Sequence, residues 1–284
     1  MTTQVVVGVD GSEESGAAVC WAARDAALRG IPLRIVHVEE PADPSQTPEP
    51  YLREAADRAE RLVREGTKLA REEVSGLEVS GEQLHGRVAE WLTAAADESD
   101  LMVLGSRGLG GVRGFVAGST SLAVVSLARR PVVLVRAPGR PRAGDAVVAG
   151  VDIREACEPL LEFSFAEAAR RQLPLRFLHT WTLPLSDGHA AIVDPGIGEE
   201  LGGHLRTRLD TLLLPWRQRY PDVKAVSAAV VGSAAHQMVE ASQDAGLVVV
   251  GRRDRTVPVG PHLGHVAHAV IHHSPAPVAV VPLA

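Results

Sequence analysis

Short runs of continuously apolar residues alternate along this chain with longer segments of helical periodicity. A continuously apolar run is typical of a strand buried on both faces, whereas surface helices repeat their apolar positions every three or four residues. In the first half this pattern predicts strands at 4–9, 33–38, 77–84, 101–104 and 132–135, and helices at 15–29, 51–73, 88–97 and 119–128. Strands that each precede a helix indicate an α/β fold, with a doubly wound parallel sheet covered by helices on both faces.

The second half of the chain repeats the first. Residues 101–136 align with residues 247–282 at a constant offset of 146 and without a gap, and Asp10 after the first strand corresponds to Asp152. We therefore expect two copies of one domain, at residues 1–138 and 145–284, each with a five-stranded sheet. The segment 137–145 between them is dense in proline and glycine and is interpreted as a linker.

Composition agrees with two soluble domains, and the net charge disfavours two classes of partner. The chain has 284 residues, of which 45% are hydrophobic and 23% charged, and its formal net charge of −6 does not favour nucleic acid or an anionic membrane. No segment reaches the length of a membrane span, and the first residues run directly into a strand, so a cytoplasmic protein is expected. Cys20 and Cys157 are not equivalent under the repeat, and two thiols make no disulfide framework.

A spaced run of glycines follows the fourth predicted strand. Gly105 and Gly108 precede Gly118 and Ser119, which open the next predicted helix. Glycine backbone can approach a ligand closely, and the N–H groups of a helix start attract anions. We expect Ser119 to cap this helix and to donate to a phosphate oxygen, so the run predicts a phosphate cradle. The alternative is that the glycines are only turn residues and the serine only a cap.

Asp10 ends the first strand, at the edge of the sheet where Gly105 ends the fourth. Ligands of open α/β sheets bind at the carboxyl ends of strands where the winding reverses. The carboxylate of Asp10 could hold a ribose hydroxyl or a metal ion bound to phosphate, and it could equally cap the turn that follows it. A Walker loop is excluded, because Ala17 and Ala18 stand where lysine and serine or threonine are required.

The chain resembles the universal stress protein family in its tandem two-domain form. The resemblance rests on the glycine run from Gly105 to Ser119, on Gly-Val-Asp-Gly-Ser ending at Ser12, and on His37 followed by Val38. It implies the fold of the adenine nucleotide alpha hydrolases and binding of ATP, with Mg²⁺, in the first domain. It further implies a nucleotide-dependent sensor or regulator of the stress response.

Site residues are carried over from this resemblance by position. The backbone of Val38 would read the adenine, and Asp10 and Gly105 would lie near the ribose. The residues that would hold phosphates are Gly108, Gly118, Ser119 and Thr120, and two further candidates for nucleotide contact are Gly8, at the end of the first strand, and Arg107, which is included for its charge and proximity alone.

The second domain departs from the motif. Asp254 stands at the equivalent of Gly108, and His265 at the equivalent of Ser119. An aspartate that faces a triphosphate adds like charge, so weak or no ATP binding is expected there, although neighbouring arginines could compensate in part. The segment 261–273 holds five histidines, but no metal site is expected because no carboxylate or cysteine lies at ligand spacing.

No catalytic constellation stands out, and the cradle lacks the lysine of phosphoryl-transfer sites, so a regulator is favoured over an enzyme. The alternatives are a weak ATPase or nucleotidyl-transfer enzyme, and a nucleotide-free interaction module. The strands at 132–135 and 278–281 are short and apolar and are expected at sheet edges. The resemblance implies that these strands pair domain to domain, and a homodimer of the tandem chain is expected.

Overall fold

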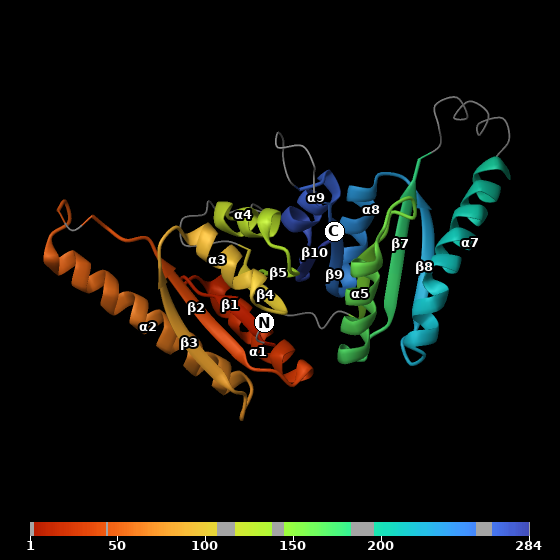
Figure 1. Cartoon of the computed structure of the whole chain (residues 1–284). Helices are drawn as coiled ribbons and strands as arrows, with labels where there is room; N and C mark the ends of the chain where they lie inside the picture. The colour runs from red at the N-terminus through yellow and green to blue at the C-terminus, as the bar shows by residue number, and fades with distance from the viewer. Residues whose placement is uncertain are drawn as a thin grey trace. The chain divides into compact units, whose positions relative to one another are not determined.

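A computed structural model of the chain describes residues 3–43, 45–106, 117–137, 145–182, 196–253 and 263–283, with the side chains of residues 196–198 excepted. The chain divides into two compact units, Met1–Pro141 (unit 1) and Arg142–Ala284 (unit 2). Each unit is an α/β domain with its own parallel strands and covering helices (Figure 1). The predicted fold class is therefore confirmed.

Unit 1 contains five parallel strands in the order β3-β2-β1-β4-β5. The strands are β1 (Val5–Gly8), β2 (Leu33–Glu39), β3 (Val79–His85), β4 (Leu101–Gly105) and β5 (Val132–Val135), and the helices are α1 (Glu13–Arg29), α2 (Glu49–Glu73), α3 (Val88–Asp97) and α4 (Ser119–Leu127). The winding reverses between β1 and β4, so these two strand ends border the crevice where ligands of such sheets bind.

Unit 2 has the equivalent order, β8-β7-β6-β9-β10. Its strands are β6 (Ala146–Gly150), β7 (Leu175–Trp181), β8 (Ala225–Val231), β9 (Ala245–Arg252) and β10 (Val278–Pro282). Its helices are α5 (Glu158–Arg171), α7 (Gly196–Arg219), α8 (Ala234–Ala241), α9 (His265–His273) and the short 3-10 turn η1 (Ser242–Asp244). The equivalence of the halves in sequence is therefore an equivalence in topology.

Helices cover both faces of each sheet. In unit 1, α1 and α2 pack against each other and onto the strands, and α3 packs against α4 and the strands (Figure 1). Because of this double cover, the central strands β1 and β4 have fully buried valine and leucine side chains. Each such side chain contributes about 1.5–3 kcal/mol when it leaves water, so the central strands form a firm support for the residues that follow them.

The outer strand β3 is different, because most of its residues are exposed or half-buried. Its Glu82 forms an ion pair with Arg34 of the neighbouring strand β2, with 2.5 Å between the nitrogen and oxygen atoms. Charged side chains are typical of an edge strand that is protected from pairing with another chain. The edge of unit 1 at β3 is thus chemically unlike its apolar last strand, β5.

Candidate functional site

Hydrogen bonds join the end of β4 to the start of α4. The backbone N–H of Gly118 donates to the carbonyl of Ser106 at 2.8 Å, and the hydroxyl of Ser121 donates to the carbonyl of Gly105 at 2.8 Å. The N–H of Ser106 in turn donates to the carbonyl of Val135 at 2.7 Å. The two ends of the glycine run, which we call the loop neck, are therefore held together. Arg107 and Gly108 lie between them, outside the described residues.

Helix α4 begins at Ser119, and its N-cap is Gly118 with an extended backbone. Since the N-cap is a glycine, it has no side chain that could make a capping hydrogen bond. The expectation that Ser119 caps the helix is therefore wrong: it is the first helical residue, and its side chain is exposed. The N–H groups of the first turn keep the partial positive charge that attracts an anion, with Ser119 and the half-buried Thr120 beside them.

Asp10 follows β1 and is half-buried. Its Oδ1 accepts hydrogen bonds from the Ser12 backbone N–H at 2.9 Å and from the Ser12 hydroxyl at 2.6 Å. The oxygen of that hydroxyl accepts from the backbone N–H of Ser15 at 3.1 Å, which caps helix α1. Asp10 therefore does fix the turn after the first strand, and this contact orients its carboxylate. The sequence did not reveal Ser12 as the residue that connects Asp10 to the helix.

Strand β2 extends beyond the end of β1. The last pair in their register joins Gly8 to Val36, and the N–H of Val9 donates to the carbonyl of Val36 at 2.9 Å. Because alternate residues of a strand turn their N–H and C=O groups to the same side, those of Val38 face the space past the end of β1. This is the geometry that backbone recognition of a ring would need.

His37 supports this end of the sheet. Its Nδ1 lies 2.8 Å from the carbonyl oxygen of Val9, and since a carbonyl only accepts, the ring must donate from Nδ1. The equivalent His179 of unit 2 makes the same contact with the carbonyl of Val151 at 3.0 Å. This histidine thus ties the second strand to the first in both units, a structural role that the sequence motif alone did not reveal.

Two of the candidate glycines lie close to neighbouring elements, and at Gly105 the neighbour is backbone. A Cβ at Gly105 would lie 2.9 Å from backbone atoms of Glu14 and Ser15, so the first turn of α1 lies directly against the end of β4. A Cβ at Gly8 would lie 2.6 Å from Cδ2 of Leu104. These glycines keep neighbouring elements close together whether or not a ligand is bound.

Unit 2 holds the carboxylate equivalent to Asp10 in another way. Asp152 accepts from the backbone N–H and Nε of Arg154 at Oδ1, at 3.1 and 3.0 Å, and from Nη2 at Oδ2, at 2.9 Å. These hydrogen bonds hold the pKa of Asp152 below its ordinary value. His265 opens helix α9 after the N-cap Gly264, and Asp254 lies outside the described residues.

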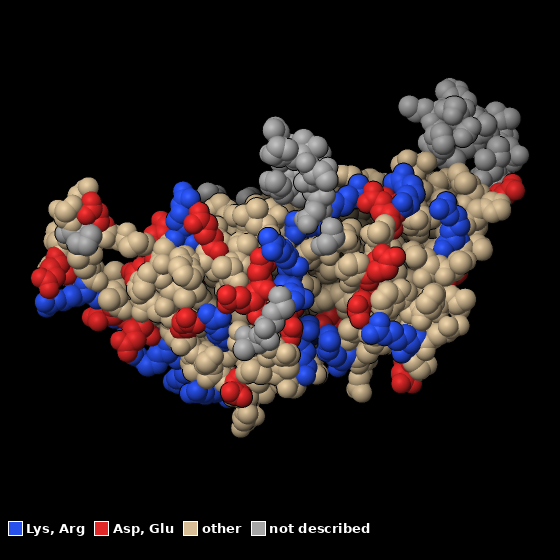
Figure 2. Space-filling model, in the orientation of Figure 1, with Lys and Arg blue, Asp and Glu red and all other residues tan. Residues whose placement is uncertain are grey.

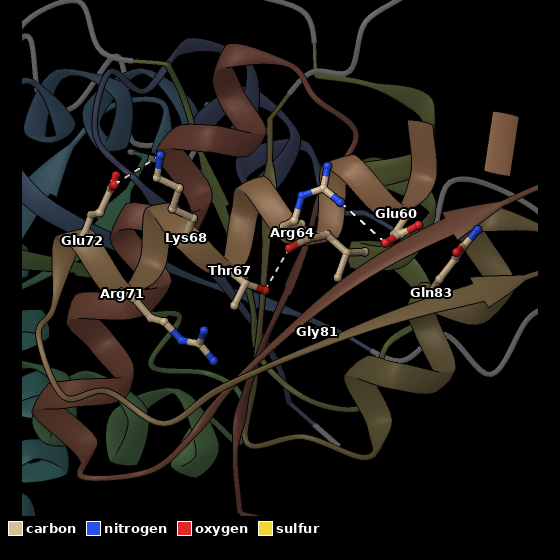
Figure 3. A pocket seen from close by; sticks show the side chains of 9 residues that line it. Glu60, Arg64, Thr67, Lys68, Arg71, Glu72, Gly81 and Gln83 are labelled. Carbon is tan, nitrogen blue, oxygen red and sulfur yellow. Dashed lines mark hydrogen bonds and ion pairs between the residues drawn. The ribbon is translucent and has the colours of Figure 1, made fainter. Parts of the chain in front are cut away.

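A large hollow of unit 1, about 740 Å³ in volume, lies elsewhere, between α2 and β3 (Figure 3). Arg64 pairs there with Glu60 at 3.5 Å, and Lys68 with Glu72 at 3.7 Å, each one turn apart on the same helix. Arg71 donates to the carbonyl of Val79 at 3.0 Å. The charges that line this hollow are therefore those of a solvated helix face, and the hollow contains none of the candidate site residues.

On the face shown in Figure 2, lysine and arginine side chains are interspersed with aspartate and glutamate. Within the described ranges, histidine, cysteine and carboxylate side chains form no group of three or more that could hold a metal ion. His268 and His272 do approach each other, with ring centroids 4.2 Å apart. The described helices include none with the length and apolar character needed to cross a membrane.

Fold and site together define a tandem, doubly wound α/β protein with a carboxylate and a helix start at its central strand ends. The sequence model of the Universal stress protein family matches residues 1–136 and 145–282. A universal stress protein of Mycobacterium tuberculosis (strain CDC 1551 / Oshkosh) is 35% identical over 97% of this chain and 94% of its own length. The chain belongs to the universal stress protein family.

A solved structure gives the same fold over the whole chain. The crystal structure of a universal stress protein from Archaeoglobus fulgidus DSM 4304 aligns with 98% of this chain and 96% of its own, with a TM-score of 0.72 at 17% identity. A shorter universal stress protein, solved in complex with cAMP, is 26% identical and aligns with 48% of this chain and 98% of its own, with a TM-score of 0.40.

Proposed function

We propose that unit 1 binds ATP with Mg²⁺, and that the protein acts as a nucleotide-dependent regulator of the stress response in the cytoplasm. The observation that carries the proposal is the loop neck, which places the start of α4 beside the end of β4. An anion at this point would meet backbone N–H groups and the positive end of a helix. The residues between the two neck positions are those of the glycine run that resembles the ATP-binding motif of the family.

The other candidate residues have roles in this proposal that agree with their positions. Asp10, oriented by Ser12, would accept hydrogen bonds from the ribose or hold the metal ion. Val38 would read the adenine through its backbone, because β2 continues past β1. Gly118, Ser119 and Thr120 would hold phosphates at the start of α4, and Mg²⁺ would offset the charge of the triphosphate there.

A regulatory role is favoured over catalysis by the composition of the cradle. It has no lysine of the kind that phosphoryl-transfer sites place on the β- and γ-phosphates. Binding without rapid turnover allows a nucleotide to act as a signal, because occupancy then follows the concentration of ATP. A single-turnover assay with radiolabelled ATP tests this part, and release of one ADP per chain within seconds would contradict it.

Calorimetric titration of ATP and Mg²⁺ into the full chain tests binding itself. The decisive variant is Gly118→Asp, which places a carboxylate at the N-cap of α4. Aspartate is a favourable N-cap residue, so the helix is preserved while the new charge repels phosphate. The matched control is Gly264→Asp, the same change at the N-cap of α9 in unit 2.

One site per chain is expected in the wild type and in Gly264→Asp, with binding weakened more than tenfold in Gly118→Asp. Circular dichroism should show the same helix content in all three proteins. Absence of binding to the wild type would contradict the proposal and favour an interaction module. Loss of binding in Gly264→Asp alone would move the nucleotide site to unit 2.

A further inference from the structure

Unit 2 contains a cavity of about 380 Å³ at the carboxyl ends of β6, β7 and β9. The starts of helices α5 and α9 also border it. This place is equivalent to the candidate nucleotide site of unit 1, but its side chains are different. The differences concern both the charges at the rim and the apolar groups of the wall.

Two arginines and two carboxylates form an ion-pair cluster at the rim. Arg154 binds both oxygens of Asp152, and Nη2 of Arg253 lies 3.4 Å from Oδ2 of the same carboxylate. Nε of Arg253 also pairs with Oε2 of Glu155 at 2.5 Å. The repeat equivalent of Arg154 is Ser12, so Asp10 of unit 1 has a neutral partner where Asp152 has a cation.

This cluster changes what the cavity can bind. With hydrogen bonds from Arg154 on both oxygens, Asp152 has less capacity to accept from ribose hydroxyls than Asp10, to which Ser12 donates at Oδ1. The two arginine side chains are mostly exposed to solvent and can exchange a carboxylate partner for an anion of the ligand. The two carboxylates remain close by, so a highly charged polyphosphate would be repelled.

The wall of the cavity is apolar. Met238 lies against Gly150, where a Cβ would be 3.1 Å from its sulfur, and Leu283 lies against Gly251, where a Cβ would be 2.8 Å from its Cδ1. Both side chains line the cavity, together with Leu160. The repeat equivalent of Leu283 is Ala137, so unit 2 has a larger apolar group at this point. Such a wall suits the flat face of a ring.

We propose that this cavity binds a compact organic anion, a molecule with an aromatic body and one anionic group. The ring lies against Met238, Leu160 and Leu283. The anionic group lies at the start of α9 and pairs with Arg253 and Arg154, in place of the carboxylates that these arginines now contact. Unit 2 is then a second ligand site with a specificity different from the ATP site proposed for unit 1.

The probe for this site is 8-anilinonaphthalene-1-sulfonate, a fluorescent fused-ring molecule with a single sulfonate. Fluorescence titration of the full chain should give one saturable site. Arg253→Gln should weaken it about tenfold, the effect of removing one charged hydrogen bond. The matched control is Arg87→Gln, which removes an exposed arginine of unit 1 that pairs with Glu90 at 2.6 Å, and it should leave binding unchanged.

The glycine variants separate this proposal from ATP binding in unit 1. Gly264→Asp should weaken the probe, and Gly118→Asp should not. A wild-type protein that does not bind the probe would overturn the proposal, as would equal binding by wild type, Arg253→Gln and Gly264→Asp. Displacement of the probe by ATP and Mg²⁺ from the Gly118→Asp protein would show that the cavity accepts triphosphates, and would also overturn it.

Discussion

At the scale of single residues, Asp10 and Asp152 show how the residue two positions later changes the hydrogen bonds and the charge around a carboxylate. Both follow the first strand of their unit, and both accept hydrogen bonds from the residue two positions later. In unit 1 that residue is Ser12, which also caps α1. In unit 2 it is Arg154, which brings a full positive charge. The turns differ as well, because α1 begins directly after Ser12, whereas α5 begins at Glu158 after the N-cap Cys157. The two carboxylates therefore offer different chemistry to a ligand.

The ion pair of Asp152 predicts the effect of removing Arg154. Since Arg154 lowers the pKa of Asp152 in the folded chain, the pair stabilises unit 2 above the ordinary carboxyl pKa and loses this effect as the pH falls. Arg154→Gln should raise the pKa of Asp152 towards its ordinary value. Carbon-13 NMR titration of the side-chain carboxyl measures this, and Arg129→Gln, a change in unit 1, serves as the control. An unchanged pKa in Arg154→Gln would contradict the ion pair.

Cys157 provides a second residue-scale prediction. Burial raises the pKa of its thiol to about 11, so only about one molecule in a thousand carries the thiolate at pH 8. Because the thiolate is the reactive form, iodoacetamide should alkylate Cys157 very slowly in the native protein and at an ordinary rate in urea. Peptide mass spectrometry measures both rates, and rapid native alkylation would refute the assignment.

At the scale of secondary-structure elements, the cap of α1 predicts an effect on stability and an effect on ligand binding. Ser12→Ala removes the side-chain cap of α1 and should cost about 0.5–2 kcal/mol in the free energy of unfolding. It should also weaken ATP binding, because Asp10 loses its partner. Ser233→Ala at α8 is the control, since Ser233 makes no capping hydrogen bond. Equal urea midpoints for the two variants would show that Ser12 is not a cap.

Replacement of glycine by alanine is expected to have opposite effects on stability at two positions. Gly105→Ala should destabilise the chain by about 1–3 kcal/mol, because the new methyl group meets the backbone of α1. Gly203→Ala should instead stabilise it by roughly 1 kcal/mol, since Gly203 lies inside α7 with no atom near the added group. Urea denaturation followed by circular dichroism distinguishes the signs, and a neutral Gly105→Ala would contradict the close approach.

The elements themselves were largely predictable, because continuous apolar runs and helical periods are local signals. Helix 88–97 and strand 132–135 agree with α3 and β5 to the residue. The start of α1 differs by two residues because Ser12 caps it. The contacts that shape the site are between distant residues, such as Gly118 with Ser106, and a periodic pattern has no signal for them.

At the scale of the whole molecule, association of chains stays a prediction. The last strands β5 and β10 are short and fully apolar. Strands of this kind favour pairing along their edges, and we expect domain pairing within the chain and a homodimer of the tandem. Light scattering after size exclusion should give about twice the 30.1 kDa of one chain. A 30 kDa species at every concentration would refute the dimer.

The loop neck has a consequence for how such a protein diverges after gene duplication. Since the ends of the glycine run are joined by hydrogen bonds of Gly118 and Ser121, the residues between them can be replaced without shifting β4 or α4. Substitutions in that segment can therefore change which ligand is bound while the sheet folds as before. A duplicated domain that keeps such a neck can acquire a different ligand while the other copy keeps its own, and one polypeptide can then respond to two signals.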